Sequence, residues 1–143
     1  MDHKSKLQEY CSSLTSYHRW PTSEVMVGSV AVGKKNPIRI QSMTTTDTMD
    51  TENTINQSIR MIEAGCEIVR ITAPSIKEAE NLKFIREGIR KKGYDTPLVA
   101  DIHFTPNAAE VAARIVEKVR INPGNFADRK KFETHKYSDK DYE

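Results

Sequence analysis

Apolar residues recur along the chain in two periods, which together predict four strands separated by three helices. In a half-buried strand apolar and polar side chains alternate, whereas on one face of a helix apolar side chains recur every three to four residues. Short aliphatic runs typical of strands occupy residues 36–43, 67–72, 97–103 and 117–122. The helical period lies between them, at Ile55, Ile59 and Ile62, at Leu82, Ile85 and Ile89, and at Ala108, Val111, Ala112 and Ile115.

Local signals indicate where these helices begin and end. Ser75 and Glu78 have the spacing of a capping box at the start of the second helix, and Pro106 occupies the first position of the third. Gly65 and Gly93 are placed to end the first and second helices.

A hairpin is predicted before this alternating region, because Val25, Val27, Val30 and Val32 surround Gly28-Ser29 within residues 24–33. The βαβαβαβ order that follows demands a parallel sheet with right-handed crossovers. We therefore divide the sequence into three parts. They are a polar leader at 1–22, an α/β domain at 23–128, and a charged linker or the start of a missing segment at 129–143.

The direction of each side chain follows from its position in the strand, because successive residues point to opposite faces. One parity is apolar and should face the helices, at Ile38 and Ile40, Val69 and Ile71, Leu98, Ala100 and Ile102, and Val119 and Ile121. The other parity carries Gln41, Arg70 and Thr72, Asp101 and His103, and Arg120 and Asn122.

Polar groups at the carboxyl ends of consecutive strands favour a (β/α)₈ barrel, in which the face away from the helices is the interior and the carboxyl rim carries the chemistry. In an open doubly wound sheet helices cover both faces, and such polar stacking is harder to satisfy. The expected fold is the N-terminal half of a TIM barrel, with four parallel strands and a preceding hairpin.

Composition and charge exclude several classes of protein. The 22 basic and 20 acidic residues are interspersed, which gives no basic patch for nucleic acid. No run approaches the ~20 apolar residues of a membrane span or the core of a signal peptide. Cys11 and Cys66 have neither disulfide-framework nor metal-site spacing. We expect a cytoplasmic protein with no nucleic-acid or membrane partner and no metal site of its own.

The repeated arginine in EIVRIT and EKVRIN points to an anion, because a buried guanidinium is costly without an anionic partner. Arg70 and Arg120 are candidates for binding a phosphate, although each could instead form a structural ion pair. Asp101 is either that structural partner or part of the site. His103, Asn122 and Asn125 follow strand ends and can bind oxygen atoms. Gln41 is equally well a hydrogen-bonding residue of the barrel rim.

Two further features have simpler readings. Cys66 follows a helix end, and we interpret it as a small buried apolar residue rather than as a nucleophile. The run from Thr44 to Thr46 is typical of a turn, with a lesser chance of phosphate contact.

The segments IRIQSMTTTDT, AGCEIVRIT, PLVADIHF and VRINPGN, in this order, resemble the N-terminal part of the 4-hydroxy-3-methylbut-2-enyl diphosphate synthase family. The resemblance covers about residues 24 to 128. The leader and tail are similar to the longer, three-domain members. By motif match, the family's substrate-binding role falls on Arg70, Asp101, His103, Arg120, Asn122 and Asn125.

The resemblance implies an oxidoreductase of the methylerythritol phosphate pathway of isoprenoid biosynthesis. Its TIM barrel would bind 2-C-methyl-D-erythritol 2,4-cyclodiphosphate, which is opened by a two-electron reduction with loss of water. A C-terminal domain would hold a four-iron four-sulfur cluster on three cysteines and a glutamate, with flavodoxin or ferredoxin as the electron donor. The full-length enzyme would be a homodimer.

The sequence departs from the family by stopping after the fourth predicted strand, where a closed barrel needs eight. Cys11 and Cys66 do not match the cluster ligands. We expect an N-terminal fragment that is inactive alone and assign no catalytic residue. The alternatives are a non-redox phosphate-binding barrel, such as a pterin-type transferase, and a non-catalytic half-barrel module.

Overall fold

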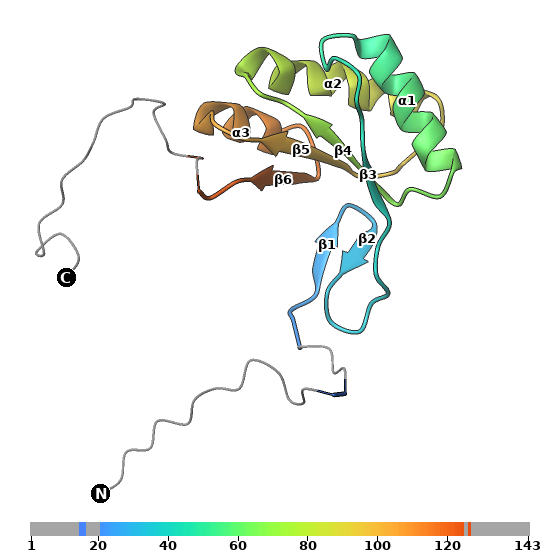
Figure 1. Cartoon of the computed structure of the whole chain (residues 1–143). Coiled ribbons are helices and arrows are strands. Elements are labelled where there is room, and N and C mark those ends of the chain that lie inside the picture. Colours follow the sequence, from blue (N-terminus) through green and yellow to red (C-terminus); the bar gives the residue numbers. More distant parts are fainter. Residues whose placement is uncertain (1–14, 17–20, 125, 127–143) are drawn as a thin grey trace, which may run out of the picture.

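A four-stranded parallel sheet, covered by helices on one face, forms the centre of the structure (Figure 1). The computed structural model describes residues 15–16, 21–124 and 126. The sheet has the order β3-β4-β5-β6, with bounds Gln41–Met43, Ile68–Thr72, Leu98–Ile102 and Lys118–Ile121. The connecting helices are α1 (Thr51–Glu63), α2 (Ile76–Lys91) and α3 (Pro106–Ala113).

The observed order of elements confirms the predicted alternation of strands and helices. Most of the leader predicted at 1–22, and all of the linker predicted at 129–143, lie outside the described residues. None of the helices in the described part of the chain is long and apolar enough to cross a membrane.

The predicted hairpin is also confirmed, as β1 (Val25–Val27) paired antiparallel with β2 (Val30–Val32). Gly28 in its turn has φ +58°, a conformation that side chains disfavour. A Cβ built on Gly28 would lie 3.2 Å from Pro97 Cβ and 3.3 Å from Glu117 Cγ. The turn therefore packs against the amino ends of β5 and β6, and in Figure 1 the hairpin lies beyond that end of the sheet.

The apolar core lies between the sheet and the helices, on the face that strand parity predicted. Strand and helix side chains share one buried cluster, in which Val69, Ile71, Leu98, Ala100 and Ile102 meet Leu82, Ile85, Ile89, Ala108 and Ala112. Burying these aliphatic side chains stabilises the fold by about 25 cal/mol for each Å² of apolar surface removed from water.

Helix α1 differs from the others in what it buries. Its fully buried residues are Thr54 and Ser58, whereas its three isoleucines are half-buried. The buried hydroxyls are satisfied, because Thr54 Oγ1 donates to the Asp47 carbonyl at 3.0 Å and Ser58 Oγ to the Thr54 carbonyl at 2.7 Å. The apolar period thus predicted the helix correctly but not its most buried positions.

The first strand is shorter than predicted, and the expected burial of Ile38 and Ile40 is wrong. Strand β3 begins only at Gln41, and the two isoleucines before it are 87% and 61% exposed. They have the parity of the helix-facing side. However, β3 is an edge of the described sheet, and no helix of the described region covers the segment before it.

Two glutamates at matching positions of EIVRIT and EKVRIN bind the starts of neighbouring strands. Glu67 Oε2 accepts the backbone N–H of Ile40 at 2.9 Å, and Glu117 Oε2 accepts that of Leu98 at 2.9 Å. Each also pairs with arginine. Glu67 binds Arg39 at 2.7 Å, and Glu117 binds Arg86 at 3.1 Å and Arg90 at 3.2 Å.

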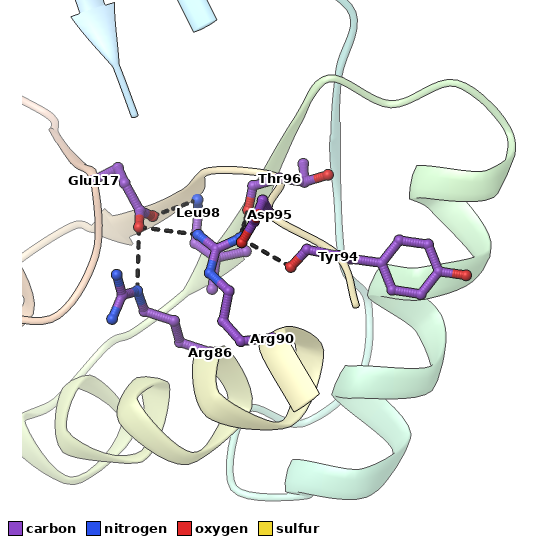
Figure 2. A network of polar contacts seen from close by, with 7 residues as sticks. All are labelled: Arg86, Arg90, Tyr94, Asp95, Thr96, Leu98 and Glu117. Carbon is purple, nitrogen blue, oxygen red and sulfur yellow. Dashed lines mark hydrogen bonds and ion pairs between the residues drawn. The ribbon is translucent and has the colours of Figure 1, made fainter. Parts of the chain in front are cut away.

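The contacts of Glu117 form a network at the amino ends of β5 and β6 (Figure 2). Arg86 and Arg90 reach it from α2, so one carboxylate joins that helix to both strands. Burial acts to raise the pKa of Glu117, but the hydrogen bond from Leu98 N–H and the Arg86 contact outweigh burial and hold that pKa below its ordinary value. In a TIM barrel this end of the strands serves stability rather than chemistry.

Candidate functional site

The polar residues predicted to share the helix-free face are brought together by the register of the parallel strands. Thr72 of β4 lies opposite Asp101 of β5, which lies opposite Arg120 of β6. Arg70 lies one layer lower, opposite Val99. Since opposed residues of a parallel pair point the same way, these side chains occupy the face away from α1–α3, as predicted.

Both arginines bind the same carboxylate. Arg70 Nε donates to Asp101 Oδ2 at 2.9 Å, and its Nη2 contacts that same oxygen. Arg120 Nη1 donates to Asp101 Oδ1 at 2.9 Å. Asp101 therefore lies between guanidinium groups from the strands on either side of its own.

The carboxylate is buried, but the side chains of the two arginines are partly exposed. The side chain of Asp101 is 1% exposed, against 26% for Arg70 and 39% for Arg120. Burial acts to raise the pKa of Asp101, and the hydrogen bonds from Arg70 and Arg120 outweigh burial and leave that pKa lowered. The carboxyl group is ionised at neutral pH.

Two arginine cations and one carboxylate leave the cluster with a surplus positive charge, formally +1. The sequence left two interpretations of Arg70 and Arg120 open, a structural ion pair and an anion site. The two interpretations are compatible. Asp101 accepts hydrogen bonds from some of the guanidinium nitrogens, and the nitrogens that it does not engage can meet a second anion.

His103 and Asn122 lie at the carboxyl ends of β5 and β6, next to this cluster. His103 Nε2 is 3.7 Å from Asp101 Oδ2, and its side chain is 35% exposed. Asn122 is half-buried, and its Oδ1 accepts the N–H of Gly124 at 3.2 Å. By strand parity, both residues continue the face of Asp101 and Arg120 one layer further towards the carboxyl end.

The structure does not bring Gln41 to the cluster, and Asn125 lies outside the described residues. Gln41 is opposite Ile68, four residues before the position of β4 that faces Asp101. At about 3.3 Å per residue, this places it roughly 13 Å from that layer, towards the amino end of the sheet.

Sequence reasoning missed the side chains that shape the loop beside the site. Thr48 Oγ1 donates to the Thr72 carbonyl at 2.6 Å, and Asn81 Nδ2 donates to the Thr48 carbonyl at 2.6 Å. Asn81 is a polar residue within α2, and its position alone gave no signal of this role. The backbone N–H groups of Thr45 and Thr46 donate to Gln57 Oε1 at 3.0 and 3.2 Å, which supports the turn reading of the threonine run.

The described residues do not fit an iron–sulfur cluster, which needs several cysteine ligands. Cys66, the cysteine within the described region, is buried as predicted, and its Sγ contacts the Ile68 carbonyl at 3.0 Å. No three His, Cys, Asp or Glu side chains of that region are grouped to hold a metal ion.

A hollow lies elsewhere on the described part of the molecule. It has a volume of about 950 Å³ and runs along α1, where Asp50, Asn53, Arg60 and Tyr94 are among its lining residues. Thr46 lines it, but none of the substrate-binding residues predicted within the described part of the chain does. The cluster around Asp101 lies instead on the helix-free face of the described sheet, with the side chains of its two arginines partly exposed.

Comparison with known proteins gives a consistent result. Residues 22–140 match the protein family described as the GcpE TIM-barrel domain. The chain is 56% identical over 133 residues to the 4-hydroxy-3-methylbut-2-en-1-yl diphosphate synthase (flavodoxin) of Akkermansia muciniphila, which covers 93% of the chain and 23% of that protein.

Proteins of the same name from two other bacteria are similar to the chain. That of Leptospira interrogans is 56% identical over 126 residues, with 88% of the chain and 19% of the relative covered. That of Chlorobaculum tepidum is 51% identical over 134 residues, with 94% and 18% covered. The chain thus spans about a fifth of the length of the curated relatives it matches.

Proposed function

Because the chain belongs to the GcpE TIM-barrel domain family, we propose that it is part of a 4-hydroxy-3-methylbut-2-en-1-yl diphosphate synthase and contributes to its substrate site. The relatives named above, at 51–56% identity, support this assignment. The whole enzyme is then an oxidoreductase of isoprenoid biosynthesis. Its substrate is 2-C-methyl-D-erythritol 2,4-cyclodiphosphate, and flavodoxin is its electron donor.

The observation that carries the proposal is the pair of arginines on either side of Asp101. They come from two different strands, and both lie on the helix-free face near its carboxyl end. A TIM-barrel enzyme binds its substrate at this end. Guanidinium groups suit phosphate oxygens because each presents several N–H donors in a fixed plane.

The residues have distinct roles in this proposal. Arg70 and Arg120 bind the diphosphate oxygens of the substrate. His103 and Asn122, at the next layer of β5 and β6, bind phosphate or hydroxyl oxygens. The four-iron four-sulfur cluster that the family implies would supply the electrons for ring opening, and its ligands are not among the described residues.

Calorimetric titration of the 143-residue chain with the cyclodiphosphate tests the proposal. Arg70→Ala and Arg120→Ala should each weaken binding about tenfold or more, because a hydrogen bond to a charged group contributes roughly 1.5–3 kcal/mol. Arg114→Ala is the matched control, since Arg114 is exposed at the end of α3 on the helix side. Unaltered affinity in both site variants, or no binding by the unsubstituted chain, would contradict the proposal.

A further inference from the structure

We propose that Asp101 is a positioning residue of the anion site, which holds Arg70 and Arg120 ready for the diphosphate and does not itself touch the substrate. The inference rests on the proposed function in one respect, since it takes the two arginines as the groups that bind the anion. It assigns the carboxylate a separate role, acting through both of them.

The geometry leaves Asp101 no means of contacting a ligand while the arginines are in place. Its side chain is 1% exposed. Oδ2 accepts from Nε and Nη2 of Arg70, and Oδ1 accepts from Nη1 of Arg120. A phosphate that reached either oxygen would have to displace a guanidinium group, and it would then meet a carboxylate of its own sign.

Asp101 is also the best-anchored residue of the cluster. It lies in β5, whose five residues are all buried and which pairs with a strand on each side. Its carbonyl accepts the N–H of Ala73 at 3.0 Å. A fixed carboxylate in the middle strand thus sets the positions of two long, flexible side chains that come from the flanking strands.

The donors that Asp101 does not use are the ones suited to a ligand. A guanidinium group carries five N–H donors on three nitrogens. Within the described part of the chain, Nη1 of Arg70 and both Nε and Nη2 of Arg120 donate to no carboxylate. Ordering these donors before the ligand arrives lowers the entropic cost of binding.

The effect of Asp101→Asn on the affinity for the anion distinguishes a residue that positions the arginines from one that competes with the substrate for them. Asp101→Asn keeps the shape of the side chain but raises the formal charge of the cluster from +1 to +2. If Asp101 merely competes with the substrate for the arginines, the variant binds the anion more tightly. If Asp101 positions the arginines, the variant binds more weakly in spite of the added charge.

The experiment is a calorimetric titration of the 143-residue chain with the cyclodiphosphate. We expect Asp101→Asn to weaken binding about tenfold. The matched control is Asp95→Asn, which adds the same charge at a side chain that is 95% exposed and should change the affinity less than about twofold. Affinity in Asp101→Asn that is equal to or above that of the unsubstituted chain overturns the inference.

A second variant separates the effect of the position of the carboxylate from the effect of its charge. Asp101→Glu keeps the carboxylate but lengthens the side chain, so it should displace both arginines and also weaken binding. Affinity equal to that of the unsubstituted chain would overturn the inference. Binding that is weakened by neither Arg70→Ala nor Arg120→Ala would instead overturn the proposed function, so the two failures are distinguishable.

A measurement on the unsubstituted chain makes the test independent of how well the variants fold. The Nε–H of Arg70, which donates to Asp101 Oδ2, should exchange slowly with water in arginine side-chain NMR spectra. We expect this slow exchange to persist when the cyclodiphosphate is added. Its loss on binding would show that the ligand displaces Asp101, and would overturn the inference.

Discussion

Glu117 lies just before β6 and Arg120 lies within it, and Glu67 and Arg70 repeat this spacing at β4, two strands away. The glutamate of each pair accepts one backbone N–H at or just before the start of a neighbouring strand, and the arginine three residues later binds Asp101. At the scale of single residues, charge therefore has two uses in this sheet. It fixes strand positions at the amino end and prepares an anion site towards the carboxyl end.

These carboxylates make stability depend on pH in a defined direction. The folded chain lowers the pKa of Glu117 and Asp101 below their ordinary values of 4.5 and 3.8. In acid the unfolded chain therefore binds more protons than the folded chain. The contribution of the two carboxylates to the free energy of unfolding is complete above about pH 4.5 and is lost as pH falls through their lowered pKa values. We expect the free energy of unfolding, measured with urea between pH 3 and pH 7, to fall below pH 4.5.

Glu117→Gln is the informative variant for this pH dependence. It should be less stable than the unsubstituted chain at pH 6 but should lose less stability on acidification, because one of the titrating groups is gone. Glu87→Gln, at an exposed position of α2, is the control. An unchanged slope in Glu117→Gln would show that other groups dominate the acid response.

At the scale of elements, one glycine sets how closely α1 and α2 approach. A Cβ built on Gly88 would lie 2.2 Å from Ile55 Cδ1 and 3.1 Å from its Cγ1. Ala has a better helix propensity by about 1 kcal/mol, but overpacking costs roughly 1–3 kcal/mol. The cost of the clash should exceed the gain in helix propensity. The new methyl group would be too close to Cγ1 of Ile55 as well as to the terminal Cδ1, so a movement of the side-chain terminus alone would not relieve the clash.

We therefore expect Gly88→Ala to lower the free energy of unfolding by about 1 kcal/mol. Ile55→Val removes Cδ1 and should cost about 0.5–1.5 kcal/mol alone, but little or nothing in the Gly88→Ala background. Urea denaturation of the two single variants and the double variant gives the coupling between the positions. Additive changes would show that the helices separate freely to admit the new methyl group.

The sequence predicted most elements because their signals are local. The Ser75–Glu78 capping box, proline at the first position of α3 and the glycines after α1 and α2 each act within a few residues. Strand parity likewise identified the face that Arg70, Asp101 and Arg120 share.

The features that the sequence did not predict depend on contacts that its periodicity does not encode. The exposure of Ile40 is set by what covers an edge strand, and the burial of Thr54 by its carbonyl partner in the preceding loop. The sharing of one carboxylate by both arginines depends on the register of three strands, which periodicity does not give. Strand parity could not exclude Gln41 from the cluster. Parity predicts to which face of the sheet a side chain points, but not how far along the strand direction it lies from the other residues.

At the scale of the whole molecule, the described sheet has two edges. Strands β3 and β6 each pair on one side only, and apolar side chains are exposed beside them, among them Ile38, Ile40, Met43 and Ile121. Unpaired strand edges next to apolar surface pair readily with other chains.

We expect the 143-residue chain to self-associate at micromolar concentrations, as measured by sedimentation equilibrium. Ile40→Lys and Ile121→Lys should weaken association, because a charge beside an edge strand opposes pairing. Lys77→Ala, at an exposed position near the start of α2, is the control. A monomer at every concentration would count against open edges in solution.

The position at which the hairpin turn packs has a consequence for the order of folding. Gly28 packs on Pro97 and Glu117, the latter roughly ninety residues further along the chain, and contacts this distant in sequence form slowly. On the ribosome the turn can close on its own as soon as it emerges, but it cannot dock until the last strand of the described sheet has been synthesised. We therefore expect the hairpin, although first in the sequence, to be among the last parts to dock during folding.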